Sequence, residues 1–361
     1  MVKMNVGCLV YYWGERYEKI GKIAVDSFKK FHPDVTLHHI DDRTRENYSS
    51  SKFIKEYGTA VHKFMLAYEI MIKHKYDRII ILGADTITCS RFDEFLGGKI
   101  NFGSPANLDK YDVITTLDYP YQVSLPYKFD TPITASSARS IPANTVFTVN
   151  TPIVLLDQDK NLRLTGAFVD HIKDEEDPVE YLHVNADIVC FCDPKALKKV
   201  ISTTVRYHNL FFGKEAAHWP ANVWLTEAFY AEQGGLNIFC SFSINPHIEE
   251  YNYSIGFADA PYSRSDCVYN ARAKGNISAK AGEKPWGPFL NKWSVKNNKL
   301  YDSHGKQIKA YHYCEGLGGM TDTDFKSVIN TYIFEWFNDD TKKFFKKHCE
   351  TEDFFEKEFS F

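Results

Sequence analysis

The segment from residue 5 to residue 82 alternates between short apolar runs and amphipathic patterns, and this alternation restricts the fold more than any other feature of the chain. Apolar or β-branched runs at 5–12, 35–40 and 79–82 predict strands, whereas 17–31 and 60–75 carry apolar residues at the three-to-four residue spacing of a helix. The last run is apolar at every position, which is typical of an interior parallel strand. The order β-α-β-α-β predicts a doubly wound half-sheet that binds its ligands at the carboxyl ends of the strands.

The pattern after residue 107 is less regular. Prolines such as Pro120 and Pro142 interrupt it, and in this part only residues 146–159 predict a β-hairpin. A strand over 182–191, a helix over 194–202 and a helix over 223–231 follow. The chain beyond residue 324 shows two further helical patterns that are rich in Phe and Lys.

The composition is that of a folded globular protein and argues against several classes. Hydrophobic residues make up 44% and charged residues 25% of the chain. The formal net charge of -4 argues against a nucleic-acid-binding protein, because such affinity comes from clustered Lys and Arg. No apolar stretch reaches the ~20 residues that cross a membrane, and the first residues lack the apolar run of a signal peptide, so we expect a cytoplasmic protein. The eight scattered cysteines predict buried free thiols.

A basic and aromatic run near the C-terminus leaves two interpretations open. Residues 342–347 read KKFFKK, and Phe354, Phe355 and Phe359 follow. Such a run could make a peripheral contact with a membrane surface. It could also form a packed helix with a solvated basic face, which is the more common arrangement.

A tight turn, Gly83-Ala84-Asp85, follows the apolar strand and predicts where chemistry takes place. It projects the Asp85 carboxylate into the crevice at the carboxyl edge of the sheet. A carboxylate there suits a hard divalent cation, which can bridge protein and diphosphate. The alternative is an Asp that merely caps the next turn, and the turn by itself does not decide between them.

The motif ILGADTIT, followed by FDEF, resembles the LDADTxV segment of the glycogenin-like, retaining GT-A glycosyltransferases. The opening VYYWGERYEK resembles the first strand and helix of that family, in which an aromatic residue near Tyr11 or Tyr12 would contact the nucleobase. HKFMLAYEIM resembles the next helix, whose basic residue, here Lys63, would lie near the nucleotide. The resemblance implies a GT-A (Rossmann-like) α/β fold with a mixed, mostly parallel central sheet flanked by helices.

Three later segments follow in the order of the same family. HVNADIVCF resembles the FNxGV strand, so Asn185 would contact the donor sugar, and LTEAFYAEQGGLN resembles the DQDxLN segment, so Glu227 would be its acid. AYHYCEGLGG resembles the H-x-x-G loop, which makes His312 a metal ligand beside Asp85. The backbone amides of Gly316 and Gly318 could approach a phosphate. A core histidine and a ligand-free glycine turn are the alternatives for this last segment.

The chain departs from the family at three positions of the site. Gly83 replaces the first Asp of the Asp-x-Asp motif, which usually touches both ribose and metal, Asp187 stands where Gly is usual, and Ala228 stands where the family has Gln beside its acid. The first departure leaves Asp85 and His312 as the expected protein ligands of a manganese or magnesium ion. Asp187 and Glu227 are the candidate catalytic carboxylates, one to receive the proton of the acceptor hydroxyl and one to stabilise positive charge on the sugar.

The resemblance implies a domain division and an activity. We expect a catalytic domain over 1–320, comprising a nucleotide-binding half (1–106), an insertion near the acceptor side (107–180) and an acceptor half (181–320), and then a helical extension over 321–361. The expected reaction transfers a sugar from a nucleotide-diphosphate donor, by analogy a UDP-sugar, to a hydroxyl of a glycan, protein or lipid, with retention. A sugar nucleotidyltransferase and a catalytically inactive glycan-binding protein of the same fold are the alternatives.

Overall fold

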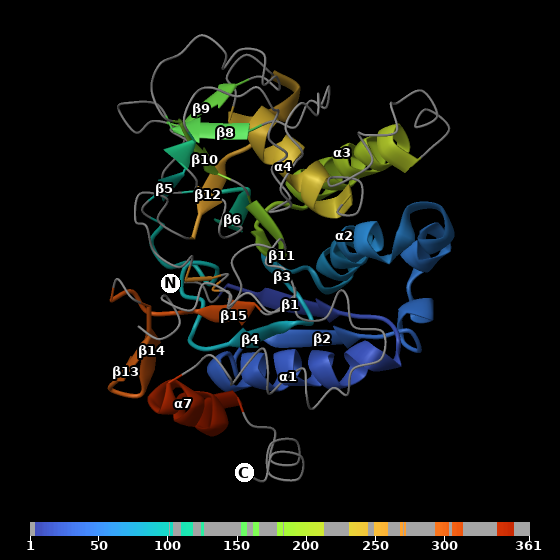
Figure 1. Ribbon diagram of the computed structural model, residues 1–361. Helices are drawn as coiled ribbons and strands as arrows, with labels where there is room; N and C mark the ends of the chain where they lie inside the picture. The colour runs from blue at the N-terminus through green and yellow to red at the C-terminus, as the bar shows by residue number, and fades with distance from the viewer. Residues whose placement is uncertain are drawn as a thin grey trace, which may run out of the picture.

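The computed structural model of the chain is shown in Figure 1. The structure describes residues 4–100, 102–103, 110–117, 124–125, 153–156, 162–165, 179–182, 184–212, 231–244, 249–258, 268–269, 271, 293–302, 305–312 and 338–349.

The predicted β-α-β-α-β order of the N-terminal part is confirmed. Strand β1 (Val6–Tyr11), helix α1 (Glu15–Phe31), strand β2 (Thr36–Ile40), helix α2 (Ile54–His74) and strand β3 (Arg78–Leu82) follow one another, and β1 pairs in parallel with both β2 and β3. Short 3-10 helices at Arg45–Asn47 and Ser49–Phe53 connect β2 to α2.

Helix α2 begins earlier than the sequence pattern predicts, at Ile54 rather than at residue 60. Gly58 interrupts it with a φ of 78°, a left-handed conformation that glycine adopts without steric cost. The regular part of the helix starts after this kink, and the apolar periodicity of the sequence reports only that part. Lys75, with a φ of 52°, ends the helix in the left-handed conformation.

The main sheet is mixed, with the strand order β2-β1-β3-β11-β6-β12-β5. Its second half consists of β11 (Val184–Phe191), β6 (Val113–Leu117), β12 (Ile255–Phe257) and β5 (Phe102–Gly103). Strands β2, β1, β3, β6 and β12 run in one direction, and β11 and β5 run in the other. The predicted α/β class with a mixed, mostly parallel central sheet is therefore confirmed. Strand β6 comes from the segment expected as an insertion, yet it lies within this sheet.

Helices cover both faces of the main sheet. Alternate residues of each central strand point to opposite faces, so Ile79 and Ile81 join a core with helices α2, α3 (Pro194–Phe212) and α4 (Ala231–Ile244). Ile80 and Leu82 join the other core with α1 and the loop that contains Phe92 and Phe95. Because both faces are buried, β3 is apolar at nearly every position, as the sequence predicts.

The outcome for the later elements is mixed. The strand expected over 182–191 is β11, and the helix expected over 194–202 continues to Phe212 as α3. Of the expected helix at 223–231, all but the last residue lies outside the described residues. Of the hairpin expected over 146–159, only β8 (Ile153–Leu156) lies within the described residues, and it pairs with the later strands β9 (Leu162–Thr165) and β10 (Val179–Leu182). Pairing depends on distant segments that local alternation does not reveal.

Three smaller sheets and two helical segments complete the described structure, and one of these sheets pairs β4 (Thr86–Thr88) with β15 (Ala310–His312). Strand β7 (Ser124–Leu125) adds to β10 in the four-stranded sheet, which lies at the top of Figure 1. Strands β13 (Ser294–Lys296) and β14 (Lys299–Tyr301) form a hairpin beside α7 (Asp339–Cys349), and α7 also contacts α1. A further 3-10 helix spans Glu249–Tyr251.

The described part of the KKFFKK run folds as helix α7 and faces the protein with its aromatic residues. Phe344 and Phe345 are buried, and the Phe345 ring lies 5.7 Å from that of Tyr311, whereas Lys343 and Lys347 are exposed. This is the packed helix with a solvated basic face, so these two rings do not contact a membrane. Among the described residues no helix has the length and apolar character needed to span a bilayer.

The described cysteines are free, as expected. Cys8, Cys89, Cys190 and Cys240 are buried, and Cys192 is half-buried. Burial raises the pKa of the Cys8 and Cys240 thiols above the ordinary range, so neither is a reactive thiolate at neutral pH.

Candidate functional site

Three segments that are far apart in the sequence meet at the carboxyl end of β3. Asp85 lies in the turn between β3 and β4 (Thr86–Thr88), and β4 pairs antiparallel with β15 (Ala310–His312) so that His312 faces Thr86. On the other side, β11 pairs antiparallel with β3, with Ile188 opposite Leu82, and the backbone N–H of Gly83 donates to the carbonyl of Asp187 at 2.6 Å. Asp85, Asp187 and His312 therefore share one end of the sheet.

The side chains of these three residues converge on one point. His312 Nε2 lies 3.2 Å from Asp85 Oδ1 and 3.8 Å from Asp187 Oδ2, and one ligand atom from each residue falls within 4.8 Å of the others. With metal–oxygen bonds of about 2.1 Å, octahedral neighbours are about 3.0 Å apart and opposite ligands about 4.2 Å apart. The distances of the two carboxylates from His312 lie inside that range, so the donor set fits a hard divalent cation.

An irregularity in β11 places the Asp187 carboxylate in this cluster. The pairing of β11 with β6 changes register between Asn185 and Cys190, which marks a β-bulge or a similar irregularity, and such irregularities re-aim side chains. The Asn185 side-chain oxygen accepts the backbone N–H of Asp187 at 2.7 Å, and the hydroxyl of Thr116 donates to the carbonyl of Ile188 at 2.7 Å. Asn185, predicted to contact the donor sugar, is buried in the structure and supports Asp187.

A buried lysine and a buried glutamate lie behind the cluster. Lys63 Nζ, from α2, is 2.6 Å from Asp187 Oδ1 and 3.6 Å from Glu232 Oε1, from α4. Burial alone would lower the pKa of Lys63, but the nearby carboxylates of Asp187, Glu232 and Asp85 outweigh it and raise the pKa. Burial raises the pKa of Glu232 despite its neighbour Lys63. Lys63 is thus a permanent cation beside the expected diphosphate position.

Glu232 is a site residue that the sequence reasoning missed. It is 8% exposed, and its Oε2 has no hydrogen-bond partner within the described part of the chain. A buried carboxylate oxygen without a partner is costly in a native protein, and a ligand hydroxyl can satisfy it. Glu232 belongs to the same LTEAFYAEQGGLN segment as Glu227, so the signal was the second acid of that segment.

Both tyrosines predicted for the nucleobase are buried. The Tyr11 hydroxyl lies 3.1 Å from His62 Nδ1 on the α2 side of the sheet, and the Tyr12 hydroxyl lies 2.6 Å from His39 Nε2 on the α1 side. The exposed ring at the end of β1 is Trp13, which is 39% exposed and 5.8 Å from the Tyr11 ring. Its place directly after two tyrosines in an apolar run was the signal that could have identified it.

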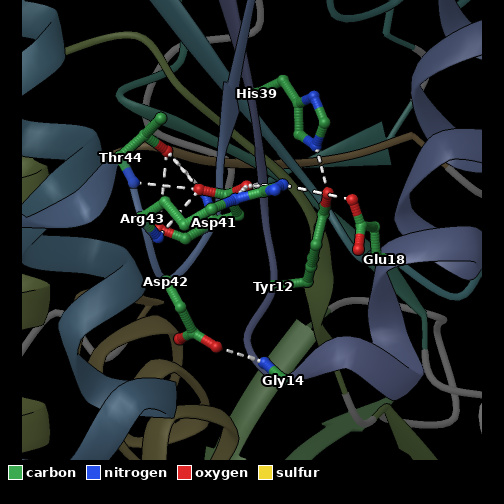
Figure 2. Close-up of polar contacts among 8 residues, drawn as sticks. All are labelled: Tyr12, Gly14, Glu18, His39, Asp41, Asp42, Arg43 and Thr44. Atoms are coloured by element: carbon green, nitrogen blue, oxygen red, sulfur yellow. Dashed lines mark hydrogen bonds and ion pairs between the residues drawn. The ribbon is translucent and has the colours of Figure 1, made fainter.

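Two acids after β2 make the polar contacts of this corner of the fold: Asp42 holds the loop that follows β1, and Asp41 holds its own turn (Figure 2). Asp42 accepts the backbone N–H of Gly14, at the start of α1, where Gly14 has a φ of 81°. Asp41 accepts hydrogen bonds from the backbone N–H groups and the side chains of Arg43 and Thr44. Burial raises the pKa of Asp41, but these hydrogen bonds together outweigh it and hold the pKa below its usual range. The loop is therefore anchored by charged turns rather than by a glycine-rich segment.

Three of the predicted site residues lie outside the described residues. These are Glu227, the expected acid, and Gly316 and Gly318, the expected phosphate-binding glycines. The other eight predicted site residues are described and lie at or next to one edge of the main sheet. They are Tyr11, Tyr12, Lys63, Gly83, Asp85, Asn185, Asp187 and His312.

The chain was also compared with known proteins. No protein-family model and no curated protein sequence matches it. Its structure is similar to that of the apo bifunctional glycosyltransferase WbbM, at 10% identity and a TM-score of 0.39, over 77% of this chain and 42% of that chain. It is also similar to the galactosyltransferase LgtC in complex with donor and acceptor sugar analogues, at 10% identity and a TM-score of 0.36, over 85% of this chain and 87% of that one.

A third similar structure is an active-site mutant of LgtC, at 10% identity and a TM-score of 0.38, over 91% of this chain and 96% of that one. The chain thus spans less than half of the WbbM chain.

Proposed function

We propose that this protein is a glycosyltransferase that moves a sugar from a nucleotide-diphosphate donor to a hydroxyl group of a glycan, protein or lipid acceptor. The observation that carries the proposal is the convergence of Asp85, Asp187 and His312 at the carboxyl end of β3, the edge at which a doubly wound sheet binds nucleotides. The motif resemblance around residues 79–88 supports the same activity, with UDP as the nucleotide of the donor.

The electrostatics of the site suit the departure of a nucleoside diphosphate. When the glycosidic bond breaks, negative charge grows on the leaving phosphate and positive charge grows on the anomeric carbon. A manganese or magnesium ion, when bound by Asp85 and His312, would neutralise the leaving diphosphate. Lys63 adds a fixed positive charge next to this position, and its burial keeps the charge effective.

Two acids from one segment are the candidates for the sugar side of the reaction. The buried Glu232 carboxylate can accept a sugar hydroxyl at Oε2, and it can stabilise positive charge on the sugar ring. Glu227 remains a predicted catalytic acid. We further propose that the reaction retains the anomeric configuration, as the motif resemblance implies; NMR analysis of the product anomer tests this point.

The nucleobase end of the donor is assigned to the edge of β1 and β2. Trp13 exposes an aromatic face there, and aromatic rings stack on bases of any kind. The buried Tyr11 ring contacts the Trp13 ring, with their centroids 5.8 Å apart and their planes tilted by 48°. A sugar nucleotidyltransferase would need a basic, glycine-rich phosphate loop after β1, but the Gly14 N–H of this loop is already bound by Asp42. This contact favours the glycosyltransferase over that alternative.

Calorimetry with UDP, with and without manganese, tests the proposal together with an assay of UDP release from UDP-sugars. The wild type should bind UDP more tightly with manganese and release UDP from at least one UDP-sugar. The variant Asp85→Asn should lose both properties, whereas Asp93→Asn, an exposed acid in the following segment, should keep them. UDP binding and turnover that are unchanged in Asp85→Asn would refute the proposed function.

A further inference from the structure

We propose that Asp187 is the second carboxylate ligand of the cation site and occupies the space that a side chain at position 83 would fill. The inference rests on the proposed function, which places a divalent cation beside Asp85. In this chain the turn after β3 has one acid, Asp85, and a second acid, Asp187, lies on the neighbouring strand β11. The site then has two carboxylates and one imidazole, Asp85, Asp187 and His312, although only one acid remains in the Gly83-Ala84-Asp85 turn.

Asp187 already fills the space that a side chain at position 83 would need. A Cβ atom added to Gly83 would lie 2.8 Å from the Cβ and 3.3 Å from the Cγ of Asp187, and 3.2 Å from Asp85 Oδ1. Carbon atoms at 2.8 Å overlap, so no residue other than glycine fits at position 83 while Asp187 keeps its place. Glycine at position 83 and the acid at position 187 are therefore linked sterically, because a side chain at 83 and the Asp187 side chain would need the same space.

The pairing register of β3 and β11 also brings positions 83 and 187 together. Ile188 pairs with Leu82, so the next residues along the two antiparallel strands, Asp187 and Gly83, face each other. Their backbones are joined by the 2.6 Å hydrogen bond from the Gly83 N–H to the Asp187 carbonyl. A carboxylate on either strand at this level of the sheet can reach the same point in front of Asp85.

The two oxygens of the Asp187 carboxylate have different neighbours. Oδ1 receives Lys63 Nζ at 2.6 Å, and Oδ2 is the oxygen that lies 3.8 Å from His312 Nε2. Lys63 thus holds one oxygen and orients the other toward Asp85 and His312. A charged partner behind a ligand carboxylate is the usual way in which an outer shell orients a metal ligand. Lys63 is a positioning residue in this arrangement.

The experiment measures manganese binding directly, by electron paramagnetic resonance of free Mn²⁺ and by calorimetry, in the absence and presence of UDP. The variants are Asp187→Asn, Gly83→Asp, the exchange variant Gly83→Asp/Asp187→Gly, and Glu249→Gln, which removes one exposed acid as a control. Thermal denaturation of each variant reports whether it is folded. The probe is the metal ion itself, so the readout does not depend on turnover.

Asp187→Asn should weaken manganese binding by tenfold or more, and Glu249→Gln should leave it unchanged. Gly83→Asp alone should lower the melting temperature because of its contact with Asp187. The exchange variant should melt above Gly83→Asp, because the contact with the Asp187 side chain is gone, and it should bring manganese affinity to within about threefold of the wild type, which a purely structural role of Asp187 does not explain.

Two results would overturn the inference. One is wild-type manganese affinity in Asp187→Asn, and the other is a folded exchange variant that fails to bind manganese. In both cases binding by the wild type keeps the proposed function intact. If the wild type itself binds no manganese with or without UDP, the cation-bridged diphosphate of the proposed function fails as well.

Discussion

The buried residue His32 makes the stability of the fold dependent on pH in a way that can be calculated. It is fully buried, its Nδ1 lies 3.1 Å from the carbonyl of Phe28, and its Nε2 accepts the backbone N–H of Phe92 at 2.8 Å. An imidazole that donates from one nitrogen and accepts at the other must be neutral. It joins the end of α1 to the segment that follows Asp85, so its protonation loosens the support of the site.

Burial lowers the pKa of His32 from 6.5 to about 4, and the hydrogen bond to Phe28 offsets only part of this effect. The unfolded chain therefore binds a proton more readily than the folded chain between these two values. The stabilisation by neutral His32 is complete above pH 6.5 and is lost as the pH falls toward 4. The loss amounts to about 2 kcal/mol at pH 5 and about 3 kcal/mol when both states are protonated.

The substitution His32→Gln isolates this effect from other titrating groups, because glutamine offers one donor and one acceptor but does not titrate. We expect the variant to be less stable at pH 7 by about 1–3 kcal/mol, owing to lost packing on the Phe28 ring. Urea unfolding followed by tryptophan fluorescence at pH 7 and pH 5 measures both proteins. The difference in unfolding free energy should shrink by about 2 kcal/mol at pH 5. A difference that is equal at the two pH values would refute the reasoning.

Three further predictions concern the site and its support. Lys63→Met should lower the free energy of unfolding by about 3–5 kcal/mol, because it leaves the Asp187 and Glu232 carboxylates without their buried cation. Urea unfolding measures this loss, and a value below about 1 kcal/mol would contradict the proposed balance of charge between Lys63 and the two carboxylates. Trp13→Ala should weaken UDP binding by about 1–3 kcal/mol in calorimetry without changing the melting temperature. Ile72→Ala, at a more exposed apolar position near the carboxyl end of α2, serves as the control and should bind UDP as the wild type does. Gly235→Ala on α4 should lower the free energy of unfolding by about 1–3 kcal/mol, since the new Cβ would lie 2.5 Å from the Cα of Thr204 on α3. Thermal unfolding measures this effect, and an unchanged melting temperature would show that α3 and α4 move apart without cost.

Local sequence patterns were sufficient for the elements of the first half of the sheet. The two periodicities of strand and helix arise from contacts within a few residues, so β1, α1, β2, α2 and β3 are all readable from the chain. The kink at Gly58 shifted one boundary only. The partners of β8 were not readable, because the choice among distant strands depends on which surfaces meet in the folded protein.

The sequence by itself predicted the buried strand that ends before Asp85 and the turn that carries Asp85, since both follow from the apolar run and the Gly83-Ala84-Asp85 sequence after it. It also placed Lys63 on a helix and Asp187 on a strand, but it put His312 in a loop rather than on strand β15, and it did not show that the three residues meet. Only the tertiary structure decided that the irregular strand β11 carries Asp187 opposite Gly83 and that β15 brings His312 to Asp85. Register between distant strands is set by the packing of the whole core, and a carboxylate missing from one strand can therefore be supplied by its neighbour.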